Sequence, residues 1–159
     1  TDRSRGLGDV YKRQVQSAKD MYDAVIERAD SMDIIVKAAA VADYRPKNVS
    51  SEKVKKQDGN MSIELERTDD ILKTLGERKN GQFICGFSME TENMLENSRK
   101  KLEKKNCDMI VANNLKQDGA GFGGNTNIVT IITKDDEVQL EKMTKDEVAE
   151  KIFDFILSR

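Results

Sequence analysis

The chain has 159 residues, of which 37% are hydrophobic and 35% charged, and its formal net charge is -2. This length allows one domain with a modest core, and the near-neutral charge excludes a general electrostatic attraction to nucleic acid or to an anionic membrane surface. Because the sequence contains no histidine, Ser-His-Asp and Cys-His catalysis and most zinc sites are excluded as well. Lysines, carboxylates, amides and backbone groups must carry out any chemistry.

The two cysteines, Cys85 and Cys107, lie within apolar runs, which favours reduced, buried thiols in a cytoplasmic protein. No apolar run approaches the roughly 20 residues of a membrane-spanning helix. The polar start of the sequence lacks the apolar core of a signal peptide. We therefore expect a cytoplasmic protein that binds neither nucleic acid nor a membrane.

Residues 1–14 show neither helical nor strand periodicity and predict a non-native or disordered leader, followed by a single domain over residues 15–159. Apolar residues then recur at spacings of three and four, which predicts a helix ending near residue 29. A nearly continuous apolar run over residues 33–44 predicts a strand that is covered on both faces. This strand must stop near Pro46, because proline lacks an amide donor.

A polar, lysine-rich segment over residues 47–60 has too little apolar area to pack firmly, and it predicts a mobile flap. Residues 61–67 alternate between apolar and polar side chains, which indicates a half-exposed strand. Thr68 and the two aspartates after it predict the start of a helix that runs through Arg78.

The second half of the chain repeats the alternation of strand and helix. We expect a buried strand over residues 82–87, a helix over 91–105 and a strand over 108–113. After a glycine-rich loop at 119–127 come a further strand and a terminal helix from Thr144. Right-handed parallel crossovers follow from this order, so we predict an α/β fold with a Rossmann-like, doubly wound, mostly parallel sheet and helices on both faces.

Ligands of such sheets bind beyond the carboxyl ends of the strands, and three strand ends here turn polar. At residues 38–44, three alanines allow a ligand to come close before Asp43 supplies a carboxylate. At residues 85–91, a glycine also permits close approach and Phe87 could lie against a planar base. Two asparagines at 113–114 could form hydrogen bonds with the polar edge of a ligand. Tight helix packing, a core phenylalanine and an ordinary turn are the alternative interpretations of these three patterns.

Lysines are the remaining candidates for an anion site. Three lie in the predicted flap, and Lys101 and Lys105 are one turn apart on one face of a predicted helix. A solvated surface is the ordinary explanation in a lysine-rich chain, but together with the small-residue strand end these lysines could enclose a triphosphate. The glycine-rich loop precedes a strand, so it fits neither dinucleotide-binding nor Walker spacing.

Four segments, AAAVADYRPKNVSSEKVKK, GFSMETEN, DMIVANNL and GAGFGGNTN, resemble phosphopantothenate-cysteine ligase, the carboxy-terminal half of a bacterial bifunctional coenzyme A biosynthesis flavoprotein. The resemblance runs from about Val15 to the end of the chain. It implies a Rossmann-like homodimer that ligates 4'-phosphopantothenate to cysteine with CTP through an acyl-cytidylate intermediate. It also implies Mg²⁺ alongside CTP, whereas FMN would bind only the decarboxylase half, which this sequence lacks.

The resemblance assigns a role to particular residues. It implies nucleotide contacts by Lys37, Ala38, Ala39, Asp43, Ile84, Cys85, Gly86, Phe87, Lys101 and Lys105. Asp43 would act through the sugar or the metal. Lys53 matches a flap lysine associated with conversion of the acyl-cytidylate, and a positive charge there would stabilise negative charge on the acyl-phosphate. Lys55, Lys56 and Asn113 are further candidates for closing the site over the substrate.

Members of this family begin with a glycine-rich strand-turn-helix segment, and nothing before Val15 matches that segment. We therefore expect a fragment that is weak or inactive as a ligase by itself. Two alternatives remain at this point. The chain could be a noncatalytic nucleotide-binding or dimerisation module, or it could belong to an ATP-using ligase of the same family.

Overall fold

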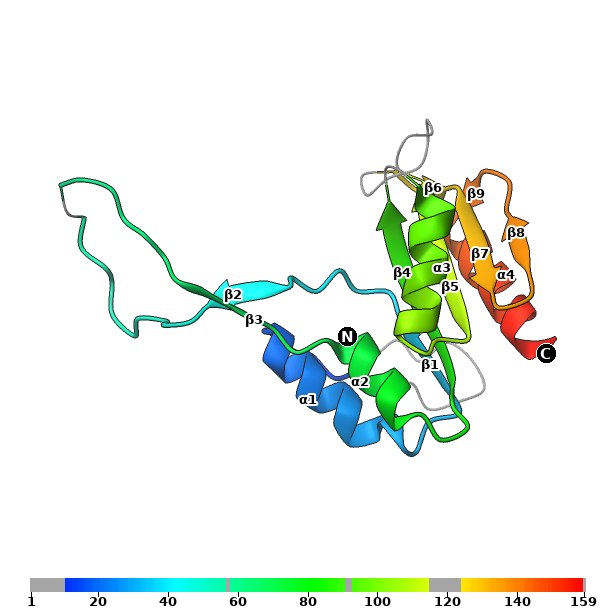
Figure 1. Ribbon diagram of the computed structural model, residues 1–159, viewed down its shortest axis with the longest axis horizontal. Coiled ribbons are helices and arrows are strands. Elements are labelled where there is room, and N and C mark those ends of the chain that lie inside the picture. The colour runs from blue at the N-terminus through cyan, green and yellow to red at the C-terminus, as the bar shows by residue number, and fades with distance from the viewer. Residues whose placement is uncertain (1–10, 57, 91–92, 115–123, 159) are drawn as a thin grey trace.

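A five-stranded sheet forms the centre of the computed structural model, which describes residues 11–56, 58–90, 93–114 and 124–158 (Figure 1). In spatial order the sheet contains β1 (Ile34–Lys37), β4 (Phe83–Glu90), β5 (Met109–Asn114), β7 (Val129–Thr133) and β8 (Glu137–Gln139). The β1–β4 and β4–β5 pairings are parallel, whereas β5–β7 and β7–β8 are antiparallel. The predicted α/β class is confirmed, and the sheet is mixed because its last two strands form a hairpin.

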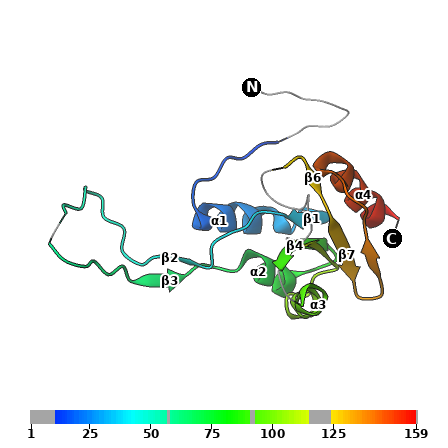
Figure 2. The same ribbon diagram turned by 90° about the horizontal axis from the view of Figure 1, so that it is seen from above.

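Helices cover both faces of this sheet, as predicted. The face that carries Ile84 and Ile110 packs against α1 (Ala18–Ala29), α2 (Ile71–Arg78) and α3 (Met94–Lys104). The opposite face, with Met109 and Val111, packs against α4 (Lys145–Leu157). Figure 2 shows α3 and α4 on opposite sides of the sheet. Because β4 and β5 are buried on both faces, their sequences are almost continuously apolar.

Side-chain caps explain why three of the helices begin where they do. Ser17 and Asp20 form a reciprocal capping box at the start of α1, and Thr144 and Glu147 form another at α4. Asp70 accepts a hydrogen bond from the backbone N–H of Lys73 at 2.9 Å and caps α2. These polar residues precede apolar helical stripes, so the helices could be predicted to within a few residues.

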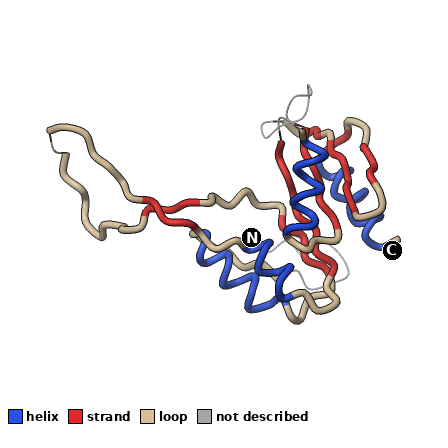
Figure 3. Tube along the Cα trace, viewed as in Figure 1, coloured by secondary structure: helices blue, strands red, loops and turns tan. Residues whose placement is uncertain are grey.

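The strand predicted over residues 33–44 ends much earlier, at Lys37, because the alanines after it leave the sheet and are exposed. Instead, β2 (Tyr44–Pro46) pairs antiparallel with β3 (Leu65–Arg67), the observed part of the strand predicted over 61–67. These two strands and the described residues between them form an arm, residues 43–56 and 58–67, which extends away from the sheet (Figures 1 and 3). The predicted flap is the distal part of this arm.

The remaining strands are β6 (Thr126–Asn127) and β9 (Met143–Thr144), which pair antiparallel before α4. Three sequence predictions fall partly outside the described residues: the leader, the start of the helix predicted over 91–105, and the glycine-rich loop at 119–127. Residues 11–16 have no regular secondary structure. Both cysteines are free and buried, as predicted. Within the ranges given above, none of the helices has the length and apolar character that a bilayer crossing requires.

One contact between helices fixes their relative positions, and we call it the α2–α3 junction. Gly76 of α2 lies against the residues that follow α3, where a Cβ atom would overlap the carbonyl oxygen of Lys105. The Asn106 side chain donates a hydrogen bond to the Gly76 carbonyl at 2.9 Å, and Asn106 itself has a φ of 50°. The junction therefore requires a residue without a side chain at position 76.

We predict that Gly76→Ala destabilises the protein by about 1–3 kcal/mol, the usual cost of forcing extra volume into a packed site. Helix propensity alone would favour alanine by up to about 1 kcal/mol, so the sign of the change separates the two effects. Chemical denaturation measures the free energy of unfolding. Gly124→Ala is the control, since a Cβ there would make only an ordinary van der Waals contact, at 3.9 Å from the Thr126 backbone nitrogen. An unchanged stability of Gly76→Ala would contradict the junction.

Candidate active site

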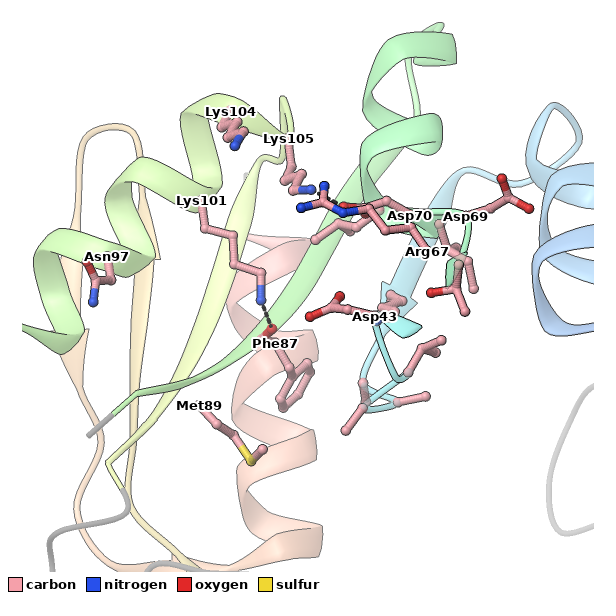
Figure 4. Close-up of a pocket in the computed structure, with 18 of the residues that line it drawn as sticks. Asp43, Arg67, Asp69, Asp70, Phe87, Met89, Asn97, Lys101, Lys104 and Lys105 are labelled. Carbon is pink, nitrogen blue, oxygen red and sulfur yellow. Dashed lines mark hydrogen bonds and ion pairs between the residues drawn. The ribbon is translucent and has the colours of Figure 1, made fainter. Parts of the chain in front are cut away.

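A cavity of about 760 Å³ lies at the carboxyl ends of β1 and β4, where the sheet topology predicts a ligand site (Figure 4). Its walls are the irregular segment after β1, the start of α2, one face of α3 and the ends of β4 and β5. Of the residues predicted from sequence, it brings together Lys37, Ala38, Ala39, Asp43, Phe87, Lys101, Lys105 and Asn113. Most of the predicted nucleotide contacts thus lie around one cavity.

Three predicted nucleotide residues do not line this cavity. Ile84 and Cys85 are only 1% and 0% exposed, because they lie inside β4 between the helical layers. At Gly86 an added Cβ would press against side-chain atoms of Leu72 and Ile110. These residues therefore pack in the core beneath the cavity and hold the end of β4 in place. The absence of a side chain at Gly86 lets α2 pack closely against the strand.

The flap lysines are also separated from the cavity. Lys53, Lys55 and Lys56 are exposed and lie on the distal part of the arm, and none of them is among the lining residues. The arm does begin at the cavity, however, since Tyr44 of β2 and Arg67 of β3 both line it. A change in the direction of the arm at these residues would move the three lysines relative to the cavity.

The positive charge of the cavity comes from α3, β1 and the base of the arm. Lys101 donates a hydrogen bond to the Phe87 carbonyl at 2.9 Å, and Lys105 is ion-paired with Asp70 (Figure 4). Burial of Lys37, together with the positive charge of Lys101, lowers the pKa of Lys37 below its usual value. Lys37 is half-buried, and the structure shows no hydrogen bond or ion pair of its ammonium group to the described residues. An anion bound here would relieve this crowding of like charges.

Asp70 occupies a special position because it caps α2 and also pairs with Lys105. Burial alone would raise the pKa of Asp70, but the hydrogen bonds from Lys105 and from the Lys73 backbone outweigh it and hold the pKa below its usual value. Asp70 therefore stays ionised and keeps Lys105 at the edge of the cavity.

Sequence reasoning missed the segment from Arg67 to Ile71, which forms one wall of the cavity. Thr68 ties this wall to the segment after β1, since its hydroxyl donates to the Ala42 carbonyl at 2.6 Å and its N–H to the Asp43 carbonyl at 3.0 Å. One signal in the sequence could have identified this wall. The capping aspartate between a strand and a helix indicates that the helix begins at the same edge of the sheet as the cavity. Lys100 and Lys104 of α3 were missed as well.

The cavity has carboxylates but no metal-binding cluster formed by side chains alone. Asp43, Asp69 and Asp70 all line it. In the described part of the chain, however, no group of three or more histidine, cysteine, aspartate or glutamate residues is placed to hold a metal ion. A magnesium ion at Asp43 would therefore need oxygen ligands from a substrate, as is usual for Mg²⁺ bound with nucleotide phosphates.

The chemistry that this site offers is binding and charge stabilisation. Burial raises the pKa of Cys85 to about 12 and that of Cys107 to about 11, so neither thiol is an active nucleophile. Ammonium groups held in a partly enclosed cavity can instead neutralise a phosphate and stabilise negative charge that develops during group transfer. The arrangement fits a reaction between anionic substrates.

Comparisons with known proteins identify the family of this chain. A model of the family "DNA/pantothenate metabolism flavoprotein C-terminal domain" matches residues 5–159. The chain is 54% identical over 134 residues to the coenzyme A biosynthesis bifunctional protein CoaBC of Bacillus subtilis, covering 84% of this chain and 32% of that protein. It is 43% identical over 152 residues to a cysteine/cysteine sulfinic acid decarboxylase of an unknown prokaryotic organism, covering 94% of this chain and 42% of that protein.

A solved structure gives the same result for the fold. The crystal structure of the C-terminal domain of a CoaBC protein superposes with a TM-score of 0.74 at 48% identity, covering 92% of this chain and 66% of that one. The chain thus spans less than half the length of the two curated relatives that it matches. Sequence and fold together show that the chain belongs to the family of DNA/pantothenate metabolism flavoprotein C-terminal domains, within which it is similar to the C-terminal region of CoaBC.

Proposed function

We propose that this chain carries the ligase site of a cytoplasmic coenzyme A biosynthesis enzyme, which joins 4'-phosphopantothenate to L-cysteine at the expense of CTP. The observation that carries the proposal is the group of half-buried lysines Lys37, Lys101 and Lys105 at the carboxyl edge of the sheet. These lysines are suited to a polyphosphate, because an ammonium group is a compact charge that phosphate oxygens can neutralise. The similarity to CoaBC supports the same assignment.

The proposed reaction has two steps. The carboxylate of 4'-phosphopantothenate attacks the α-phosphorus of CTP, the bond to the β-phosphate breaks, and pyrophosphate leaves. The amine of cysteine then attacks the acyl carbon of the acyl-cytidylate, CMP leaves, and the amine releases a proton. Both steps develop negative charge on phosphate oxygens, which the lysines would stabilise.

Predicted residues that line the cavity have roles in this proposal. Lys101 and Lys105 would bind the phosphates, and Phe87 would lie against the base. Asp43 would contact the ribose or hold Mg²⁺, whose role when bound is to offset the charge of the triphosphate. The backbone of residues 37–39 would form the edge of the nucleotide pocket.

Lys53 would act from the arm once the arm closes over the activated acyl group. The arm is weakly packed against the rest of the chain along most of its length, and its base lines the cavity, so a movement at its base would carry the lysine. Closure would also exclude water from the acyl-cytidylate, which water would otherwise hydrolyse.

The arm also supports a homodimer. Cross-strand ion pairs occupy one face of the hairpin, Arg45 with Glu66 and Lys47 with Glu64, each at 2.7 Å. The alternate face carries Tyr44, Ile63 and Leu65, which are 51%, 60% and 55% exposed. An isolated two-stranded hairpin is marginally stable in water, so a second copy of this amphipathic hairpin would stabilise it.

Two other assignments differ in what they require of the site. A noncatalytic nucleotide-binding or dimerisation module would need the lysines for binding but not Lys53 for turnover. An ATP-using ligase would differ in the base that the site accepts. The relative named as a cysteine decarboxylase does not favour a third assignment, since this chain covers only 42% of that protein.

Replacing Lys37 tests the lysine group. Lys37→Met should raise the melting midpoint without nucleotide, because it removes a buried charge among like charges, and should reduce the rise that CTP with Mg²⁺ produces. Because the pKa of Lys37 is lowered, the folded state releases this proton at a lower pH than the unfolded state does. The difference in melting midpoint between Lys37→Met and the wild type should therefore shrink as the pH rises toward 10.5. Lys151→Met, on the exposed side of α4, is the control; a midpoint shift by CTP equal to that of the wild type would contradict the site.

Replacing Lys53 separates catalysis from binding. We expect Lys53→Ala to lower the rate of product formation by about a hundredfold or more, as for the loss of one group that stabilises transition-state charge, while the midpoint shift by CTP is unchanged. Pyrophosphate release and formation of the cysteine adduct are the measurements. Lys134→Ala, in the turn after β7, is the control. Turnover by Lys53→Ala equal to that of the wild type would favour the noncatalytic module.

The dimer interface has a separate test in Leu65→Asp, which places a charge on the exposed apolar face of the arm. Sedimentation velocity should show a dimer for the wild type and a monomer for this variant, because burying the unpaired carboxylate is costly. Val138→Asp, on the exposed edge strand β8, should remain dimeric. A wild-type monomer at all concentrations would contradict the homodimer without affecting the nucleotide site.

A further inference from the structure

The cavity has two chemically different ends. Lys101 and Lys105 reach it from α3, which packs on the face of the sheet that carries Ile84 and Ile110. Phe87 and Met89 continue the alternate series of β4 side chains, which faces α4. Figure 4 shows Phe87 and Met89 at one end of the cavity and Lys104 and Lys105 at the other. A ligand that fills both ends has an anionic part and a less polar part.

Asn113 lies at the less polar end. It is the direct parallel partner of Met89 in the β4–β5 register, it follows Met109 and Val111 on the α4 face, and it lines the cavity. Side chains of these strands alternate between faces, so Met89 and Asn113 are neighbours on the same face. The apolar end of the cavity therefore has an amide beside it.

The oxygen of this amide has no partner. Among the buried side-chain oxygens and nitrogens of the described residues, Oδ1 of Asn113 and the hydroxyl of Ser98 lack a hydrogen bond, and only Asn113 lines the cavity. Buried polar atoms without partners are rare because they cost folding free energy. An unpaired acceptor in a ligand cavity is explained if a ligand supplies the missing donor.

The position of Asn113 indicates which donor this would be. A planar base lying against Phe87 and Met89 would direct one edge toward Asn113. Cytosine and adenine carry an exocyclic amine on that edge, whereas uracil and guanine carry a carbonyl oxygen at the corresponding place. A carbonyl facing Oδ1 would leave two acceptors opposed and unpaired, and a site with such a buried polar group rejects the mismatched ligand.

We propose that Asn113 selects the base of the bound nucleotide, with its Oδ1 accepting a hydrogen bond from the exocyclic amine of cytosine or adenine. This inference rests on the nucleotide binding proposed above and adds a specificity-determining residue to it. It assigns to Asn113 a contact with the base, separate from the lysine contacts with the phosphates. Amino-bearing bases are accepted, and uracil and guanine are excluded.

Isothermal titration calorimetry with CTP, ATP, UTP and GTP in the presence of Mg²⁺ tests the proposal. The wild type should bind CTP or ATP about tenfold or more tightly than UTP and GTP, which is the discrimination that one well-placed side-chain contact to a base supplies. The ratio of the CTP and ATP affinities identifies which amine the site takes. In Asn113→Leu the preference for amino-bearing bases should be lost, while all four nucleotides still bind through their phosphates.

Gln139→Leu is the matched control, because it removes an exposed amide on β8 that does not line the cavity; it should keep the preference. The melting midpoint of Asn113→Leu without nucleotide should equal or exceed that of the wild type, since the change removes an unpaired buried acceptor, whereas a purely structural role would lower it. If this variant does not fold, the wild-type affinities alone decide the question.

Equal binding of CTP and UTP by the wild type, or an unchanged preference in Asn113→Leu, would overturn the role of Asn113 while leaving the nucleotide site intact. If the wild type binds none of the four nucleotides, both this inference and the proposed function fail together. The two failures are therefore distinguishable in one set of titrations.

Discussion

The contact between α2 and the end of α3 is the constraint on which the candidate site depends. Gly76 lets the two helices meet at backbone distance, and Asn106 closes the contact with a hydrogen bond to the Gly76 carbonyl. The same contact brings the capping residue of α2, Asp70, to the last lysine of the α3 region, Lys105. The charge on one side of the cavity is thus fixed by helix packing, because neither helix can move without separating this pair.

The charged side chains that line this cavity lower the stability of the folded protein. Lys37 and Lys101 bring positive charges into a partly buried space, where burial and the nearby charge of Lys101 disfavour the charged form of Lys37. Asp70 compensates for only part of this cost, since it is already committed to Lys105 and to the cap of α2. Such uncompensated charge is common where a protein binds an oppositely charged ligand, and it therefore supports the proposed anion site.

Much of this structure could be predicted from sequence because local signals and tertiary packing agree. Capping residues and apolar stripes located α1, α2 and α4, and the apolar runs located β4 and β5. The strand after α1 was predicted too long, since an alanine-rich run is apolar yet small enough to leave the sheet and line a cavity. The sequence indicated a strand over residues 61–67 but not that it would pair within a projecting arm, which depends on contacts with the residues before Lys47.

The candidate site could likewise be predicted only in part from the sequence. Residues at strand ends were found because topology alone places them at one edge, as for Phe87 and Asn113, whereas Asp43 lies in the irregular segment after β1. The wall from Arg67 to Ile71 was missed because its residues follow a strand that lies outside the main sheet, so no strand-end rule pointed to them. Ile84 and Cys85 precede Phe87 closely in sequence, but the two-residue alternation and the helices on both faces bury them.

The burial of the two cysteines has a consequence for the proposed reaction, in which a carboxylate is activated. An acyl-cytidylate is an acylating agent toward any accessible thiolate, and the substrate of the second proposed step, cysteine, is itself a thiol. Cys85 lies two residues before Phe87, close to where such an intermediate would form, yet burial keeps its sulfur protonated and shielded by the sheet. In the proposed reaction, this burial would protect Cys85 from acylation by the intermediate, and the free amino acid would remain the acceptor.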